Sequence, residues 1–283
     1  MFSVNTKKPI TEEQIKIALY EYIELGHGQN PTMKAANISL PELRDILTKH
    51  GYKLRNRHEA IIAANKGRNL LKNQQYFQHE NENMAWLLGF FAADGSIEKN
   101  RNVMKLSLST VDKEILEKIR NEIQLESEVK DYQTSEGYNV SKIQWSSEQH
   151  KKDLAKYGII PQKTFKLTPP YQLNRKFWKD YIRGFWDGDG SITLLKNNYN
   201  SLEWQLISGT KDILEFIVNY FYEEYKIPKV NINFTNRHGN NVYTIAYSTN
   251  ASKKIYEIFY SNPNCLSLKR KKDKYTMFIQ NSK

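Results

Sequence analysis

Two aspartates stand in nearly the same short string at two places in this chain. The strings are LLGFFAADGSI, from Leu87 to Ile97, and IRGFWDGDGSI, from Ile182 to Ile192, and their shared carboxylates are Asp94 and Asp189. Each string is typical of the end of an apolar helix, and the glycine after each Asp suits the left-handed conformation that commonly stops a helix. A carboxylate that recurs in the same local setting indicates one chemical task done twice.

Small residues spaced four apart precede each aspartate. They are Gly89 and Ala93 in the first string, and Gly184 and Gly188 in the second. Residues four apart share one helix face, so two such helices can pack backbone against backbone and bring both aspartates to the same end. There the carboxylates repel, and each lies at the negative end of a helix dipole, which costs about 0.3–1 kcal/mol. A divalent cation would remove both problems, so the sequence predicts a paired metal site; close packing alone is the alternative.

The two strings resemble the paired motifs of the LAGLIDADG homing endonucleases, in the form that carries both motifs in one chain. The resemblance covers roughly residues 80–283 and implies a site-specific endonuclease that hydrolyses both strands of a long, non-palindromic DNA site. It implies metal ligands at Asp94 and Asp189 and at the backbone carbonyls of Ala93 and Gly188. The expected ion is Mg²⁺, which takes one or two carboxylates and fills its shell with water and phosphate oxygens; Mn²⁺ or Ca²⁺ can occupy such a site.

Other positions of the family pattern fall on further residues. The earlier acidic position, which is not the metal ligand, maps to Ala92 in the first string and to Asp187 in the second. The family's catalytic lysine resembles Lys163 in GIIPQKTFKL and Lys269 in CLSLKRKKDKY, where Lys271 is close enough to be confused with Lys269. Such a lysine would stabilise charge on the phosphate. A plain phosphate contact is the alternative.

The internal repeat extends beyond the two motifs. STVDKEILEKI, from Ser109 to Ile119, is answered by SGTKDILEFI, from Ser208 to Ile217. We predict an α+β fold of two pseudo-symmetric αββαββα repeats, residues 81–173 and 174–283, with a saddle-shaped pair of antiparallel sheets. The segment Lys166–Lys176 joins the repeats, because its two consecutive prolines forbid helix continuation.

Alternation of polar and apolar residues predicts the strands of each repeat. An antiparallel sheet that packs on helices with one face leaves the other face free, and in the family these free faces form a saddle on DNA. Asn and Gln suit bidentate contacts to adenine, and Lys suits guanine and phosphate; an ordinary solvated face is the alternative. The candidate DNA-contacting residues are Lys105, Ser107, Ser109, Lys142, Gln144, Gln205, Asn231, Asn233, Thr235 and Arg237.

Residues 1–80 have no counterpart in the repeat and are predicted to be helical. Glu12–Leu25 is amphipathic, with Thr11 as its cap and Gly-His-Gly as its stop, and Ser39 begins a second capped helix. The basic residues after that second helix are Lys53, Arg55, Arg57 and His58. This order favours a helix-turn-helix-like DNA-binding extension; a helical subdomain that only supports the core is the alternative.

The composition limits the classes of partner. The 283 residues carry a net charge of +11, with a pI of about 9.4, which favours a polyanion such as double-stranded DNA. No apolar run reaches the roughly 18 residues of a membrane helix, and the start of the chain lacks the apolar core of a signal peptide. We therefore expect an intracellular protein with no membrane partner. Cys265 is the only cysteine, which excludes an intrachain disulfide, and a monomer is expected because one chain holds both repeats.

Three other functions compete with a nuclease. A DNA-binding regulator on the same fold would lose the metal-binding aspartates, and both are intact here. An RNA maturase that helps an intron to splice is compatible with the sequence as a second activity. An intein-borne nuclease is disfavoured, because the sequence starts with Met and ends in QNSK without a terminal His-Asn.

Overall fold

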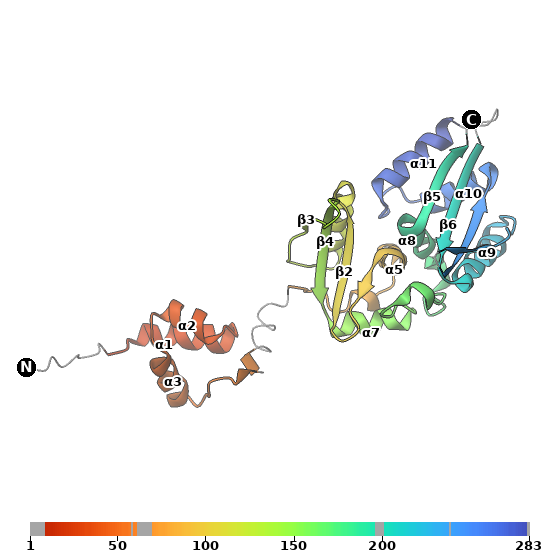
Figure 1. The fold of residues 1–283 in the computed structure, drawn as a ribbon. Helices are drawn as coiled ribbons and strands as arrows, with labels where there is room; N and C mark the ends of the chain where they lie inside the picture. Colours follow the sequence, from red (N-terminus) through yellow and green to blue (C-terminus); the bar gives the residue numbers. More distant parts are fainter. Residues whose placement is uncertain (1–8, 58, 61–69, 196–200, 238, 282–283) are drawn as a thin grey trace, which may run out of the picture. The chain divides into compact units, whose positions relative to one another are not determined.

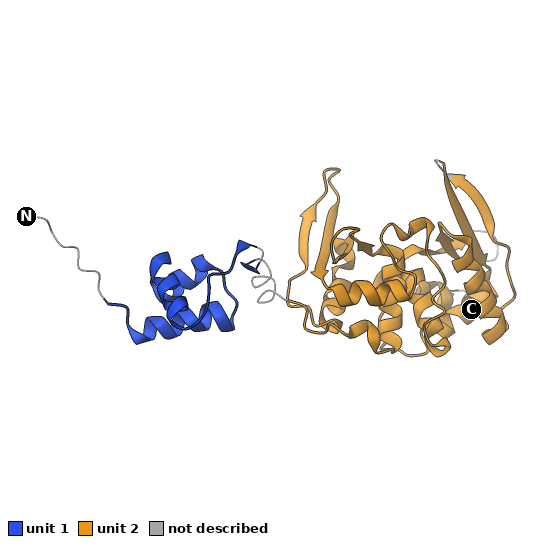
Figure 2. Ribbon diagram, turned by 90° about the horizontal axis from the view of Figure 1, so that it is seen from below, with its two compact units in different colours: residues 1–69 blue, residues 70–283 orange. Residues whose placement is uncertain are grey.

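The chain forms two compact units. A computed structural model describes residues 9–57, 59–60, 70–195, 201–237 and 239–281 (Figure 1). Unit 1 is Met1–Asn69 and unit 2 is Leu70–Lys283 (Figure 2). The predicted boundary at residue 80 therefore moves to residue 69, because Leu71, Tyr76 and Phe77 are buried in the core of unit 2. Within the described residues, no helix is both long and apolar enough to cross a membrane.

Unit 1 begins with the predicted amphipathic helix. α1 (Glu12–Leu19) starts at Thr11, which forms a reciprocal capping box with Gln14, and it continues as a π-helical turn, η1 (Tyr20–Glu24). The prediction of a helix over Glu12–Leu25 is therefore confirmed. The unit has a hydrophobic core of its own, made by Ala18, Tyr22, Ala36, Leu43, Ile46 and Leu47.

A short turn joins the next two helices of unit 1. α2 (Gln29–Ala36) leads through three residues, the first of them Asn37 in the left-handed conformation, to α3 (Leu40–Lys49). The predicted capping box between Ser39 and Glu42 starts α3. α2 has only weak signals in the sequence and was not predicted, because this helix is short, its cap is a glycine, and it buries few apolar side chains. The order of helix, short turn and helix is that of a helix-turn-helix motif.

The two repeats of unit 2 have the predicted order of elements. Repeat 1 consists of α5 (Glu82–Asp94), β1 (Ser96–Ile97), β2 (Val103–Ser109), α6 (Lys113–Glu122), β3 (Lys130–Gln133), β4 (Asn139–Ser146) and α7 (Glu148–Lys156). Repeat 2 consists of α8 (Trp178–Asp189), β5 (Gly190–Leu195), β6 (Ser201–Ser208), α9 (Lys211–Tyr225), β7 (Asn233–Arg237), β8 (Asn240–Tyr247) and α10 (Thr249–Phe259), and it adds α11 (Lys269–Asn281). Short 3₁₀ turns are η2 (Tyr76–Gln78), η3 (Thr110–Asp112), η4 (Lys163–Phe165) and η5 (Arg175–Phe177).

Each repeat contains one antiparallel sheet of four strands. The strand orders are β1-β2-β4-β3 and β5-β6-β8-β7, so the second sheet repeats the topology of the first. Figure 2 shows the sheets on either side of the central helices, with their hairpins projecting from the same side of unit 2. The predicted α+β fold of two pseudo-symmetric repeats is therefore confirmed.

α5 and α8 lie together at the centre of unit 2. α5 buries every residue from Met84 to Ala92, because it packs against both its own sheet and α8. A helix that is apolar on all sides is stable only in such a place. The inner faces of the sheets supply the apolar partners, which include Met104, Leu106, Trp145, Trp204, Leu206 and Ile245.

Candidate active site and DNA-binding faces

The two central helices meet through backbone at a pair of glycines. A Cβ atom on Gly89 would lie 1.9 Å from the carbonyl oxygen of Tyr181, and a Cβ on Gly184 would lie 1.9 Å from that of Trp86. Since Gly89 and Gly184, like Trp86 and Tyr181, are 95 residues apart, the two contacts are pseudo-symmetric copies. Neither position can accept a side chain unless the helices separate.

One turn further along, the helix pair has room for a single methyl group. A Cβ on Gly188 would lie 2.2 Å from the Cβ of Ala93 and 3.2 Å from Oδ2 of Asp94. The carboxylate of Asp94 therefore leans over the backbone of the opposite helix, one residue before Asp189. The small residues bring the carboxyl ends of α5 and α8 together.

The glycine that follows each aspartate is not left-handed, so that expectation is wrong. Gly95 has φ −73° and Gly190 has φ −88°, and both are extended. A strand begins at once after each helix, which leaves no residue for a left-handed cap. Glycine is required here for space, because a Cβ would lie 2.4 Å from the Phe91 ring or 2.0 Å from the Trp186 ring.

The two aspartates disfavour their own ionisation. Asp189 is half-buried, and the loss of water contact, followed by repulsion from Asp94, raises its pKa to about 6. Asp94 reaches solvent, yet desolvation by the surrounding protein still raises its pKa, opposed by the positive charges of Lys271 and Lys163. Each carboxylate would therefore gain from a further cation.

The donor set fits a divalent cation. Mg²⁺ uses one or two carboxylates together with water and phosphate oxygens, and Asp94 and Asp189 offer that number. The carbonyl oxygens of Ala93 and Gly188 each accept a hydrogen bond from a lysine, and a carbonyl has a second lone pair for a metal. Among the described residues, no group of three or more His, Cys, Asp or Glu could hold a metal, so a third acidic ligand does not supplement the pair.

Lys163, which the resemblance implies is a catalytic lysine, lies beside the end of α5. It stands in η4 and is 9% exposed. Its Nζ donates to the carbonyl oxygens of Ala93 (3.1 Å) and Gly95 (2.6 Å). Burial lowers the pKa of Lys163, while the carboxylates of Asp189 and Asp94 raise it.

Lys271 takes the equivalent place in repeat 2. It is 8% exposed, and its Nζ donates to the carbonyl oxygens of Trp186 (3.0 Å), Gly188 (3.0 Å) and Gly190 (2.6 Å). The last two are the counterparts of the carbonyls that Lys163 binds. Burial lowers the pKa of Lys271 to about 8, opposed by the carboxylate of Asp187.

Lys269 is not brought to the site, which corrects the sequence prediction for repeat 2. Its side chain is 70% exposed and pairs with Asp273 at 2.5 Å. Two residues along a helix correspond to a rotation of about 200°, so Lys269 points away when Lys271 points inward. The register was ambiguous in the sequence because Lys163 stands in a 3₁₀ turn, whereas Lys271 stands in α11.

Asp187, to which the sequence assigns no role in metal binding, is fully buried at the helix interface. Its Oδ2 accepts hydrogen bonds from Trp86 Nε1 on α5 (2.8 Å) and from the backbone N–H of Leu268 (3.1 Å). Burial raises its pKa to about 6. The signal in the sequence was an acidic residue at a position where the first string has Ala92.

The predicted polar residues of repeat 1 share the outer face of their sheet. Residues directly opposite in an antiparallel pair lie on the same face, and the pairs are Lys105 with Gln144, Ser107 with Lys142, and Ser109 with Val140. Glu98 forms an ion pair with Lys105, and the Lys142 ammonium lies 5.4 Å from the centre of the Tyr132 ring. The face therefore carries hydroxyl, amide and ammonium groups together.

The outer face of repeat 2 is less basic. Gln205 lies opposite Ser191 and Ala246, and Asn233 and Thr235 continue the same face on β7. Arg237 pairs with Asn240 in the same register, but its side chain lies outside the described residues. Asn231 is exposed and precedes β7, so it is not part of the strand.

The segment from α5 to α7 matches a known type of domain. Residues 81–156 match the LAGLIDADG-like domain. This chain contains a LAGLIDADG-like domain. Repeat 2 repeats its order of elements and its strand order, and Asp94 of the matched segment lies near enough to Asp189 of repeat 2 to raise its pKa.

Several solved structures are similar to this chain, whereas none of the curated proteins matches it. The LAGLIDADG meganuclease I-CpaMI bound to uncleaved DNA is 14% identical, with a TM-score of 0.48 over 72% of this chain and 91% of that one. The homing endonuclease I-WcaI bound to its DNA recognition sequence is 17% identical, with a TM-score of 0.46 over 77% and 94%. Full-length DUF199/WhiA from Thermatoga maritima is 17% identical, with a TM-score of 0.42 over 75% and 65%.

In unit 1, which precedes the LAGLIDADG-like domain, one predicted DNA-contacting residue has a structural role. Arg55 lies 4.2 Å from the centre of the Tyr22 ring and donates to the carbonyl oxygens of Tyr22 and His27 (3.1 Å for His27). It thereby ties the segment after α3 to the first helix, while its assignment as a DNA-contacting residue stays a prediction. Lys53 and Arg57 are exposed, and His58 lies outside the described residues.

Proposed function

We propose that this chain is a metal-dependent, site-specific double-strand DNA endonuclease of the LAGLIDADG homing type. The observation that carries the proposal is the pair Asp94 and Asp189, which the glycine contacts bring to one end of the helix pair and which Lys163 and Lys271 flank. Two equivalent carboxylates suit two strands of one duplex, and two unlike sheet faces suit a non-palindromic target. Mg²⁺ is the ion that this donor set fits.

Each residue of the site has a separate role in this proposal. A bound divalent ion would polarise the phosphate, supply hydroxide and stabilise the leaving oxygen. Asp94 and Asp189, with the carbonyls of Ala93 and Gly188, would hold the ion. The ammonium groups of the two lysines lie beside them and stabilise negative charge on the phosphate.

The test uses DNA that carries the empty insertion site. In this DNA, the two sequences that flank the gene for this chain are joined directly to each other. With Mg²⁺ we expect cleavage of both strands, and with a chelator none. Asp94→Asn or Asp189→Asn should lower the rate about a thousandfold, which corresponds to about 4 kcal/mol, while DNA binding persists. Asp273→Asn, which removes an exposed carboxylate outside the site, is the control. Substantial cleavage by the double variant of Asp94 and Asp189 would disprove the assignment.

The two lysines near the start of α11 provide a matched pair of variants. Lys271→Met removes the ammonium that lies on the carbonyls beside Asp189, so we expect slower cleavage by about a hundredfold, the range of one lost electrostatic contact in a transition state. Lys269→Met changes an exposed side chain two residues away and should leave the rate unchanged. Equal losses in both variants would contradict the role of Lys271.

We propose that unit 1 contacts DNA beyond the stretch that the two sheets of unit 2 contact. Its support is the turn between α2 and α3 together with the exposed basic residues Lys53 and Arg57. The variant Lys53→Ala/Arg57→Ala should bind DNA more weakly and lower the slope of log affinity against log salt by about two, since each lost phosphate contact lowers it by about one. Lys49→Ala, whose partner is Asp45, is the control. An unchanged slope would mean that these residues do not contact DNA.

A further inference from the structure

One side-chain hydrogen bond joins α5 to α8, and the pseudo-symmetric positions do not form a second copy of it. Trp86 Nε1 donates to Asp187 Oδ2 at 2.8 Å. The pseudo-symmetric counterparts, 95 residues apart, are Tyr181 for Trp86 and Ala92 for Asp187. Ala92 has no acceptor, and among the residues that the structure describes, the buried Tyr181 hydroxyl has no hydrogen-bond partner. Asp187 is therefore special to repeat 2.

The same carboxylate oxygen also holds the start of α11. Asp187 Oδ2 accepts from the backbone N–H of Leu268 at 3.1 Å. The carbonyl of Leu268 in turn accepts from the N–H groups of Lys271 and Lys272, both at 3.0 Å, and so begins the helix. A carboxylate at the N-terminus of a helix is stabilised by the helix dipole, which strengthens this attachment.

Lys271 returns from α11 to the residues around Asp187. Its Nζ donates to the carbonyls of Trp186 and Gly188, one on each side of Asp187, and to that of Gly190. The first turn of α11 is thus attached to the end of α8 at two points, through the Asp187 carboxylate and through the Lys271 ammonium. In repeat 1, Lys163 is held in a 3₁₀ turn without a carboxylate at the equivalent place.

We propose that Asp187 is a positioning residue for Lys271. By fixing the backbone of Leu268, it sets the height and rotation of the first turn of α11, and so keeps the Lys271 ammonium on the carbonyls beside Asp189. The two halves of the site then differ in construction, since only repeat 2 depends on a buried carboxylate. The consequence for strand cleavage rests on the proposed function, whereas the consequence for the mobility of Lys271 does not.

Lysine labelling measures the positioning without DNA or metal. Lys163 and Lys271 are nearly equally buried, so limiting acetic anhydride on the full chain, read by peptide mass spectrometry, should label both slowly. In Asp187→Ala we expect Lys271 to be labelled about tenfold faster, the factor that one lost hydrogen bond to a charged group gives. Lys163 should be unchanged and serves as the internal control.

Two further variants separate positioning from folding. Asp187→Asn keeps an acceptor oxygen, so it should restore slow labelling of Lys271. Trp86→Phe/Asp187→Leu removes both partners of the hydrogen bond between α5 and α8, so neither is left unpaired, and it replaces Asp187→Ala if that variant does not fold. Faster labelling at both lysines would overturn the proposal, because Asp187 would then support the whole helix pair. Unchanged labelling of Lys271 in Asp187→Ala, or in Trp86→Phe/Asp187→Leu where it takes its place, would also overturn it.

Strand-resolved cleavage provides the second readout. Asp187→Ala should slow the cut made beside Lys271 at least several times more than the cut on the other strand, whereas a loss of stability would slow both cuts equally. Equal slowing would overturn the positioning role. A wild-type protein that cuts neither strand would refute the proposed function, and the labelling result would still decide the role of Asp187.

Discussion

Repeat 1 and repeat 2 share a backbone arrangement but bury different chemistry in their central helices. The glycine contacts and the terminal aspartates are copied from α5 to α8. In contrast, α8 buries Asp180, Arg183 and Asp187 where α5 has Ala85, Leu88 and Ala92. The two repeats are therefore pseudo-symmetric where the helix backbones meet and at the candidate metal site. They differ in the buried residues on the other faces of the same helices.

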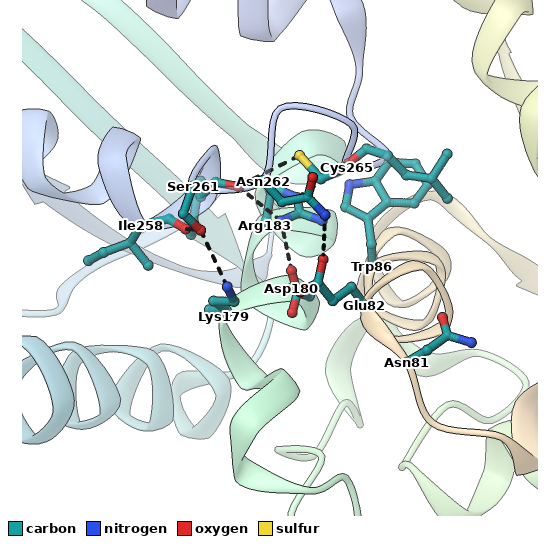
Figure 3. Close-up of polar contacts among 12 residues, drawn as sticks. Asn81, Glu82, Trp86, Lys179, Asp180, Arg183, Ile258, Ser261, Asn262 and Cys265 are labelled. Atoms are coloured by element: carbon teal, nitrogen blue, oxygen red, sulfur yellow. Dashed lines mark hydrogen bonds and ion pairs between the residues drawn. The ribbon is translucent and has the colours of Figure 1, made fainter.

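The polar groups of α8 attach a segment that exists in repeat 2 alone among the described elements. Figure 3 shows Arg183 between α8 and the loop that leads to α11. Its Nη1 donates to Asp180 Oδ1 (2.7 Å) and to the carbonyl of Phe259 (2.9 Å), and its Nε donates to that of Leu266 (3.2 Å). Repeat 1 needs no such group, because it has no counterpart of α11 to hold.

The largest expected effect comes from breaking the buried ion pair of repeat 2. Asp180→Ala leaves Arg183 buried without its carboxylate, which should lower the free energy of unfolding by about 3–5 kcal/mol. Asp180→Ala/Arg183→Leu copies Ala85 and Leu88 of repeat 1 and should cost less than the single change. Urea unfolding of both variants measures this. A double variant less stable than the single one would show that repeat 2 cannot adopt the core of repeat 1.

Substitution of the interface glycines tests the symmetry of the helix pair. Gly89→Ala and Gly184→Ala should each lower the free energy of unfolding by about 3 kcal/mol, and by equal amounts, because each new Cβ meets a carbonyl oxygen at 1.9 Å. Gly28→Ala is the control, since its Cβ would lie 3.9 Å from the nearest atom. Unequal losses from the two interface variants, measured by thermal unfolding, would show that the contacts are not equivalent.

The pH dependence of stability should report the raised pKa of Asp189. The pKa of Asp189 is raised from 3.8 to about 6, so its contribution to stability is full below pH 3.8 and is lost as the pH rises to about 6. In chelator, Asp189→Asn should flatten this fall by on the order of 1 kcal/mol, and Mg²⁺ should restore stability to the wild type above pH 6. Unfolding at several pH values measures both effects. An identical pH dependence in the variant would contradict the raised pKa.

The smallest expected effect concerns the hydrogen bond between Trp86 and Asp187, whose pseudo-symmetric copy, between Tyr181 and the position of Ala92, is missing. Tyr181→Phe removes a buried hydroxyl without a described partner, so the free energy of unfolding should stay constant or rise by up to about 1 kcal/mol. Trp86→Phe removes the bond to Asp187 and should lower it by about 1 kcal/mol. Urea unfolding compares the two. A clear loss of stability in Tyr181→Phe would show that its hydroxyl is bonded and that the helix pair is more symmetric than described.

Local patterns in the sequence determined the repeats, the capped helices of unit 1, the polar faces of the strands and the meeting of Asp94 and Asp189. These features depend on periodicity and on residue size, which a short stretch of chain contains in full. Glycines four apart allow close packing whatever else the protein does, and alternation fixes which strand residues share a face. The DNA contacts and the metal remain predictions, since they depend on partners.

The tertiary structure alone decided which groups several polar side chains contact. Lys271 replaced Lys269 because the rotation of α11 depends on its contacts with α8, and no local pattern records that rotation. Arg55 became structural because Tyr22, which lies 33 residues earlier, supplies its partner groups. Asp187 gained its two donors from residues 101 and 81 positions away. The partners of these polar side chains are brought to them by the packing of distant segments. Local sequence patterns do not show which distant segments come together.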